Sequence, residues 1–537
     1  MAKQAKQQSF LGGAAVLAGA AAVVKLIGAA YKIPLNNILG EVGKTYFNTA
    51  YYIYNVLLTI STAGLPLAIS RLTSQAHAQG RENQKRKLFR VALRLFFVLG
   101  VAGSVFMFTQ AQGLARFMNN PMARLPIMAL SPAVFCVCLL ACMRGYTQGQ
   151  GNMTPTAASQ ILEAMCKVGL GLPCAWYLIR LGLGLDAGAA GAILGVTVGT
   201  VLSMCFLIQY LLRRRDRSPS ADVPDSGTEI LKQILLIGIP ITLSNSAMSI
   251  ISVIDTKNVM GRLQNGLGLG EVEAAALNGQ YGFAMDMVNM VVAFAYPVTM
   301  SLLPAASAAL ARKDTAEVNR IVSSAFRVIT ILSLPAGVGL SVLSTPIMRL
   351  ILPAQPEAAL AAGPHLRVLG FACILIFLMI LTNAILQTYG KEIIPIFTVI
   401  AGGVTKITLN YILVGIPEIN IHGAPISTLC CYSVIVVLNL IFVWKCARPP
   451  YLRLFAKPIL ASALMGGAAW AVYGLAARVL SGGGSVGFGQ NALATLVGIG
   501  AGVVVYGVLI VALGILRAED LRAVPHGRTL IQILHLR

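Results

Sequence analysis

Apolar residues form long continuous blocks along this chain, and polar residues gather in the short segments between them. Each block holds about 20 residues, enough for an α-helix to cross a hydrocarbon core of roughly 30 Å. Because the blocks recur from end to end, no soluble domain is expected between them. The pattern predicts an all-α polytopic membrane protein with about fourteen transmembrane helices, at 10–33, 46–72, 88–110, 125–146, 155–180, 188–212, 231–259, 278–304, 322–346, 362–387, 393–415, 424–446, 456–478 and 491–516.

The composition agrees with this interpretation. Of the 537 residues, 57% are apolar and only 11% are charged, whereas about a quarter of the residues in a soluble protein are charged. The net charge of +22 would suggest a nucleic-acid partner for a soluble protein. Here the basic residues lie at helix ends and in short loops, which is the signature of membrane topology. We therefore expect no nucleic-acid partner.

The distribution of lysine and arginine predicts an orientation. Cations are concentrated at the N-terminus, in the connections between helices two and three, six and seven, eight and nine, and twelve and thirteen, and after the last helix. All of these segments fall on one side if the number of helices is even. Positively charged connections mark the cytoplasmic side, so both termini should be cytoplasmic and the glycine-rich loop at 482–489 external.

The chain also repeats itself at an offset close to 239 residues. Gln148, Pro155 and Lys167 have counterparts in order, which are Gln387, Pro395 and Lys406. Because the offset covers six helices, the repeat should be parallel, with its axis along the membrane normal. We expect two six-helix lobes related by a pseudo-two-fold axis, at 1–228 and 229–447. Two further helices and a cytoplasmic tail follow at 448–537, and the polar segment 213–228 links the lobes.

Ionisable side chains inside membrane helices are costly and usually face a bundle interior or a pathway. Lys25 and Lys32 are two helical turns apart and share one face of the first helix. They are candidates for binding an anion in a cavity. The alternative is that both extend their ammonium groups to the membrane surface, which is the simpler account for Lys32.

The fifth helix carries Glu163 and Lys167, four residues apart, in the order that favours an ion pair. This pair either lines the cavity or serves only to lower the cost of burying both charges. Lys406, the counterpart of Lys167, has Gly402 in place of the acid. Its ammonium therefore needs an anion from elsewhere, and a substrate pyrophosphate would serve. We interpret Arg144, at the inner end of the fourth helix, as an interfacial anchor.

Two carboxylates could bind a coupling ion, either Na⁺ or H⁺. Asp286 lies within the predicted eighth helix, and Asp255 lies near the outer end of the seventh. Asp255 could instead pair with Lys257 or cap the helix end. The histidines and cysteines are scattered without metal-ligand spacing, so we expect no metal site, no cofactor and no enzymatic activity. The glycines at 191, 195 and 199 should allow close helix packing.

Four segments resemble a known family. Residues 25–35 read KLIGAAYKIPL, and 51–71 read YYIYNVLLTISTAGLPLAISR. Residues 151–163 and 301–307 extend the match. These motifs are similar to the polysaccharide-biosynthesis branch of the multidrug/oligosaccharidyl-lipid/polysaccharide flippase superfamily, and within it to the stage V sporulation protein B and lipid II flippase group. The resemblance covers essentially the whole chain.

The resemblance implies two six-helix lobes around a cationic cavity, alternating access, and export of undecaprenyl-pyrophosphate-linked sugars across the bacterial cytoplasmic membrane. The ionisable residues that are candidates for lining this cavity are Lys25, Lys32, Lys167, Glu163 and Lys406. Lipid II flippases carry an arginine where Lys25 stands and a second one at the place of Tyr31. Their arginines in helices two and eight have no counterpart here, which leaves the identity of the substrate open.

We therefore expect a flippase for a lipid-linked oligosaccharide of the lipid II type, serving cell-wall or polysaccharide synthesis, including that of a spore cortex. It should be a monomer, powered by a coupling ion or by the membrane potential, with membrane lipids and possible cell-wall synthesis proteins as partners. A cation-coupled drug exporter of the same superfamily and a non-transporting scaffold for envelope assembly are the alternatives. A membrane-embedded glycosyltransferase is disfavoured, because no loop exceeds about twenty residues, too few for a catalytic domain.

Overall fold

The computed structural model describes residues 10–515, apart from gaps at 63, 215–219, 297, 300–305, 307–308, 311, 313, 483 and 485. The described part is helical throughout and contains no strand, as predicted for an all-α membrane protein. The chain divides into two compact units, Met1–Gly279 and Gln280–Arg537. The division into lobes at 228 and 447 rests on the sequence repeat and stays a prediction, and the predicted C-terminal tail lies outside the described residues.

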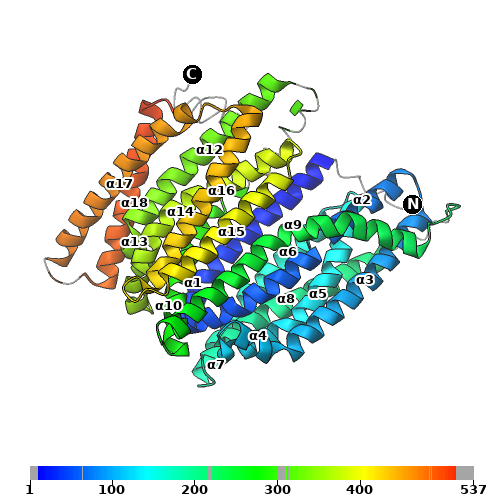
Figure 1. Ribbon diagram of the computed structural model, residues 1–537, viewed down its shortest axis with the longest axis horizontal. Helices are drawn as coiled ribbons and strands as arrows, with labels where there is room; N and C mark the ends of the chain where they lie inside the picture. The colour runs from blue at the N-terminus through cyan, green and yellow to red at the C-terminus, as the bar shows by residue number, and fades with distance from the viewer. Residues whose placement is uncertain are drawn as a thin grey trace. The chain divides into compact units, whose positions relative to one another are not determined.

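The first unit is built on a long N-terminal helix and the helices that pack around it (Figure 1). Its helices are α1 (Phe10–Thr62), α2 (Leu65–Ala78), α3 (Glu82–Thr109), α4 (Ala111–Phe117), α5 (Arg124–Gly149), α6 (Thr154–Cys166), α7 (Leu172–Arg180), α8 (Leu185–Arg213) and α9 (Gly227–Gly261). A π-helical turn, η2 (Lys167–Gly171), joins α6 to α7. Helix α10 (Glu271–Val292) crosses the boundary between the units.

The second unit contains the helices of the second half of the chain, with α17 and α18 packed side by side at its C-terminal end (Figure 1). Its helices are α12 (Thr315–Val342), α13 (Ser344–Ile351), α14 (Pro356–Thr388), α15 (Ile393–Leu413), α16 (Gly423–Ala447), α17 (Tyr451–Ser481) and α18 (Phe488–Ala512). Only α17 and α18 extend beyond the predicted repeat.

Eleven stretches of the described residues are long and apolar enough to cross a membrane. The first, Gly19–Ala78, covers two of the predicted helices. Helices α9 and α10 overlap the predicted seventh and eighth helices but are not among the eleven. The count of fourteen therefore stays a prediction, while the multi-pass architecture is confirmed.

Two predicted boundaries were wrong. We expected a loop between the first two helices, but α1 runs through it with a single non-helical residue, Gly40, at φ 64° and ψ −175°. Only glycine adopts that conformation readily, so this residue lets the helix direction change without a loop. We also expected one helix at 46–72, but the structure ends α1 at Thr62 and starts α2 at Leu65. Leu65-Pro66 opens the new helix, because proline cannot continue a helix but fits its first turn.

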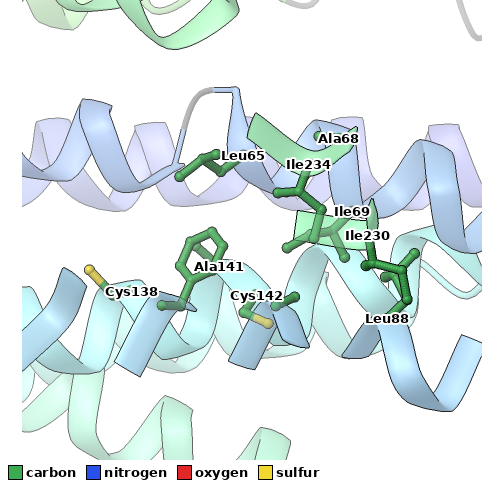
Figure 2. Packing of buried hydrophobic residues seen from close by; sticks show 11 residues of the cluster. Leu65, Ala68, Ile69, Leu88, Cys138, Ala141, Cys142, Ile230 and Ile234 are labelled. Carbon is green, nitrogen blue, oxygen red and sulfur yellow. The ribbon is translucent and has the colours of Figure 1, made fainter. Parts of the chain in front are cut away.

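Small side chains allow close packing of α2, α3, α5 and α9. Figure 2 shows their shared cluster, in which Leu65 and Ile69 of α2 face Cys138 and Cys142 of α5. At Gly145 of α5, a Cβ atom would lie 2.6 Å from the Pro66 carbonyl oxygen. In lipid there is little hydrophobic drive between helices, and association depends on such close contacts.

The glycines of α8 have the predicted packing role. A Cβ atom on Gly191 would lie 3.0 Å from the backbone nitrogen of Ala175 on α7, and one on Gly199 would lie 2.9 Å from the Glu163 carbonyl oxygen on α6. A Cβ atom on Gly195, between them, would collide with the backbone of Gly171 in η2. The glycine row therefore fixes α6, η2 and α7 against α8.

The segment that links the predicted lobes is attached to the N-terminus of α3. Helix α3 has no N-cap side chain of its own, so its first N–H groups need acceptors. The Asp222 carboxylate supplies them by accepting from the backbone N–H groups of Asn83 and Gln84, each at 2.9 Å. Arg81 forms an ion pair of 2.9 Å with Asp225. This part of the segment is thus fixed to the first unit.

Candidate functional site

Lys167 lies at the start of η2, where its ammonium is held by two tyrosines of α1. The Nζ atom lies 4.9 Å from the ring centroids of both Tyr31 and Tyr51. It also donates a hydrogen bond of 3.3 Å to the Tyr51 hydroxyl. Aromatic faces attract cations, with a stabilisation of about 0.5–2 kcal/mol depending on desolvation. The arrangement gives a half-buried ammonium a fixed position inside the first unit.

The tyrosines are themselves held in place. Tyr51 stacks on Phe47 at 5.4 Å and contacts Tyr54 edge-on at 5.7 Å, because residues three and four apart lie on one helix face. Tyr31 is buried and donates to the Ala192 carbonyl oxygen of α8. The two rings therefore form a rigid support for Lys167.

The predicted ion pair between Glu163 and Lys167 was wrong. Glu163 instead accepts a hydrogen bond of 3.2 Å from the guanidinium of Arg144 on α5. Arg144 also donates to the Ser159 hydroxyl at 2.9 Å. The π-helical turn starts at Lys167, and its ammonium contacts the rings of Tyr31 and Tyr51. The Glu163 carboxylate is instead within reach of the Arg144 guanidinium on α5. Arg144, predicted to be an interfacial anchor, is mostly buried in this ion pair.

Lys25 and Lys32 lie on α1, on the same side of the Gly40 break. Both side chains are half-buried, and both interact with neighbouring groups. Half-burial is compatible with a cavity wall and with extension to the membrane surface, so their predicted anion-binding role stays a prediction.

Lys406 lies on α15 in the second unit, also near a tyrosine. It interacts electrostatically with Tyr432 of α16, whose side chain is half-buried. Tyr281 of α10 belongs to the same group and shares a 2.9 Å hydrogen bond with Thr428. Gly402, one turn before Lys406, lets α15 approach Cys431 and Ile435 of α16 closely. Each unit thus places one of the repeat-related lysines beside tyrosine.

The two candidate coupling carboxylates are buried. Asp255 of α9 is 6% exposed and Asp286 of α10 is 4% exposed, and each interacts with neighbouring groups. Asp255 does not cap a helix end, since α9 continues to Gly261. The ammonium of its suggested partner, Lys257, lies 3.9 Å from the Phe117 ring centroid. In the described residues there is no group of three metal-binding side chains.

The sequence did not predict that tyrosines hold Lys167. Tyr31 stood out only as the place of an arginine in related flippases, and Tyr51 and Tyr54 only as part of a motif. What could not be predicted is the partner, because α1 and η2 are more than a hundred residues apart in the chain.

The chain is similar to several proteins of Bacillus subtilis (strain 168). It is 26% identical to the uncharacterized membrane protein YabM over 98% of this chain and 96% of the relative. It is 23% identical to stage V sporulation protein B, over 98% of this chain and the full length of the relative. It is also 23% identical to lipid II flippase MurJ, over 85% and 87% of the two chains.

Solved structures share the fold. A structure of lipid II flippase MurJ in an inward closed conformation matches with a TM-score of 0.69 and 13% identity, over 93% of this chain and 99% of the other. A multidrug resistance MATE family transporter of the MOP superfamily, in an inward-facing conformation, matches with a TM-score of 0.59 and 19% identity, over 80% and 99%. The MatE family profile matches residues 240–412, and the profile described as Polysaccharide biosynthesis protein matches residues 10–310. With more than half of its length covered by the latter, this chain belongs to the polysaccharide biosynthesis protein family of the MOP flippase superfamily.

Proposed function

We propose that this protein moves an undecaprenyl-pyrophosphate-linked glycan precursor of the lipid II type across the bacterial cytoplasmic membrane by alternating access. Family membership and full-length similarity to stage V sporulation protein B and lipid II flippase MurJ support a flippase for a lipid-linked precursor. The product would serve cell-wall or polysaccharide synthesis. The protein acts as a monomer, and its partners are the lipid-linked substrate, membrane lipids and enzymes of cell-wall synthesis.

The observation that carries this proposal is the position of Lys167. Its ammonium has three N–H donors, and within the described part of the chain the Tyr51 hydroxyl accepts one of them. The other donors are available to a phosphate oxygen. The carboxylate closest in sequence, Glu163, is occupied by Arg144 and so does not neutralise this charge. A half-buried cation in a membrane helix bundle is costly unless an anion reaches it.

Tyr31 distinguishes this site from that of the lipid II flippases. Lipid II flippases resembled by this chain carry an arginine at that place, and here its ring lies under the Lys167 ammonium. The positive charge beside Tyr31 is thus supplied by Lys167 of η2. Lys25 and Lys32 on α1 and Lys406 on α15 complete the proposed set of cations for a pyrophosphate.

The return of the empty transporter needs a source of energy. The membrane potential provides about 2.3 kcal/mol per elementary charge per 100 mV, which acts directly on a cationic cavity. Na⁺ or H⁺ binding at Asp255 or Asp286 is the alternative source.

A second candidate function is cation-coupled drug export. The MatE profile match at 240–412 and the MATE-like fold favour it. Lys167 and Lys406 would repel the organic cations that a drug exporter carries. A carrier of pyrophosphate requires such positive charges.

The deciding experiment uses purified protein in vesicles that contain fluorescent lipid II. We expect the protein to expose the lipid II of the inner leaflet to a reagent added outside, at a rate well above that of empty vesicles. Uptake of a fluorescent organic cation is measured in the same vesicles. Transport of the cation without movement of lipid II would replace the proposal with drug export, and movement of neither would favour the scaffold.

A further inference from the structure

An open groove of about 790 Å³ runs along an exposed face of α8 toward its C-terminal end. Its walls come from Leu162 of α6 and from one face of α8, namely Leu202, Cys205, Phe206, Ile208, Gln209, Leu212 and Arg213. The α8 positions recur at intervals of three and four residues, so they form one continuous stripe. The groove is apolar except at its C-terminal end, where Gln209 and Arg213 lie.

The packing of α8 explains why the groove starts where it does. At Gly199 the backbone of α8 contacts that of α6, since a Cβ atom there would lie 2.9 Å from the Glu163 carbonyl oxygen. Helix α8 stays close to α6 as far as Ser203, whose hydroxyl donates to the Ser159 carbonyl oxygen at 2.8 Å. Beyond Ser203, larger side chains such as Phe206 and Gln209 form the wall of the groove. Leu202 and Leu212 remain 43% and 65% exposed, so the groove is not filled by the protein itself.

The length of the groove matches one leaflet of a bilayer. Leu202 and Arg213 are eleven residues apart, which is about 16 Å along an α-helix. Half of the hydrocarbon core is about 15 Å. Arg213 also opens the basic run at 213–217, which the charge distribution assigns to the cytoplasmic surface. An acyl chain in the groove would therefore place its headgroup at Arg213.

The headgroup end of the groove is positively charged. Arg213 is exposed, and Arg214 stacks its guanidinium 5.2 Å from the Tyr210 ring centroid. Asn152 holds that ring by donating to the Tyr210 hydroxyl at 2.7 Å. Neither arginine has an acidic partner within the described residues. The partial negative charge at the end of a helix offsets only about half of one elementary charge, so a net positive charge remains.

We propose that this groove binds one acyl chain of an anionic phospholipid from the cytoplasmic leaflet, with the lipid phosphate at Arg213. Gln209 offers its amide to the ester or phosphate oxygens at the same level. An anionic headgroup keeps its net charge, whereas a zwitterionic headgroup presents its own cation to Arg213 and Arg214. The site therefore recognises the negative charge of the headgroup at Arg213 and accommodates the acyl chain along the groove.

The test measures quenching of a tryptophan by brominated phosphatidylglycerol and by brominated phosphatidylcholine in vesicles. The reporter is Leu212→Trp in a chain whose three native tryptophans, Trp176, Trp444 and Trp470, are replaced by phenylalanine. We expect stronger quenching by the anionic lipid. Arg213→Gln should lower the preference about fivefold, the value expected for one arginine at a membrane surface.

Two controls separate the groove from ordinary surface charge. Cys205→Phe fills the groove at an exposed position but leaves Arg213 in place, and it should abolish the preference. Native Trp176, kept as the only tryptophan, lies beside Arg180 at 4.1 Å and reports an arginine–aromatic pair outside the groove. An equal anionic preference at Trp176, or one that persists in Cys205→Phe, would overturn the proposal. So would displacement of the brominated lipid by a polyprenyl phosphate at much lower mole fraction than by phosphatidylglycerol, which would make the groove a site for the substrate tail.

Discussion

The hydroxyl oxygens of Thr59 on α1 and Ser249 on α9 lie 3.0 Å apart. Just beyond this contact, the backbone N–H of Gly64 donates to the Thr242 hydroxyl at 3.2 Å, and α9 has Gly238 opposite Leu65. The last turns of α1 and the start of α2 are therefore closed tightly against α9. In the predicted topology the Thr59–Ser249 contact lies near the middle of the membrane, and the Gly64–Thr242 contact lies on its cytoplasmic side. Helix α9 opens the second half of the sequence repeat.

If substrate enters from the cytoplasm by alternating access, this contact has to open during each cycle. A disulfide between Thr59→Cys and Ser249→Cys should then stop translocation, because a covalent bond would hold α1 against α9. The two hydroxyl oxygens already lie 3.0 Å apart, so the introduced sulfur atoms should be close enough to react. We expect oxidation to abolish lipid II movement in vesicles and a reductant to restore it.

A matched control lies one half-turn away on the same helix. The Ser61 hydroxyl is 3.0 Å from the native Cys138 sulfur of α5, so Ser61→Cys can be cross-linked within the first lobe of the predicted repeat. Transport should persist when that bond is formed. Transport that continues in the fully cross-linked Thr59/Ser249 pair would show that this contact does not move.

The sequence predicted most helices because lipid imposes a simple rule on them: each must be apolar for about 20 residues. Helix ends were harder. Gly40 breaks α1 without a polar segment, and the short helix α4 and most of α13 lie between the predicted transmembrane helices. Neither leaves a signal in hydropathy, since both depend on backbone geometry.

The charged residues of the candidate site could be predicted by the same rule, because ionisable residues stand out in apolar helices. The side chains that pair with these charged residues could not be predicted. Spacing of four residues favoured Glu163 with Lys167, yet Arg144 of α5 provides the ion pair and Tyr31 and Tyr51 of α1 hold the lysine. Local spacing cannot show which side chains from other helices compete for the same group.

The Arg144–Glu163 ion pair predicts unequal effects of single and double substitutions. Removing one partner of a buried pair leaves an uncompensated charge and costs about 3–5 kcal/mol, reduced to about 1–2 kcal/mol here because both side chains are partly exposed. Glu163→Gln and Arg144→Gln should each lower the unfolding temperature in detergent. The double variant should be no worse than either single one, and additive losses would contradict the ion pair.

The contact of Asp222 with α3 predicts a pH-sensitive linker. Burial acts to raise the pKa of Asp222, but hydrogen bonds from Ser220 and from the backbone N–H groups of Asn83 and Gln84 outweigh it and hold the pKa below its ordinary value. The stabilisation is thus complete above the ordinary pKa and is lost as the pH falls through the lowered one. At neutral pH, Asp222→Asn should speed tryptic cleavage in the basic run at 213–217. Glu229→Gln, an exposed neighbour, should leave the rate unchanged, and equal rates in all three proteins would contradict the anchoring role.

Topology can be tested with two exposed positions. Gly484 lies in the loop predicted to be external, and Val223, 83% exposed, lies in the linker predicted to be cytoplasmic. In a background without native cysteines, Gly484→Cys should react with an impermeant maleimide in cells with an accessible outer surface. Val223→Cys should react only after lysis. The reverse pattern would invert the orientation, and labelling of both from one side would mean an even number of spans between them.

Lys25 provides the sharpest test of the anion-binding proposal, because it lies well inside an apolar helix where an ammonium needs an anion. Lys25→Ala should abolish lipid II translocation at matched membrane abundance. Lys25→Arg should retain it, since charge is the requirement and related flippases carry arginine at that place. Lys391→Ala, which removes an exposed lysine beyond the end of α14, is the control and should transport normally. Near-normal transport by Lys25→Ala would mean that its ammonium extends to the membrane surface. Equal loss in the arginine variant would mean that the position supplies packing rather than charge, and the phosphate would then depend on Lys167 and its two tyrosines.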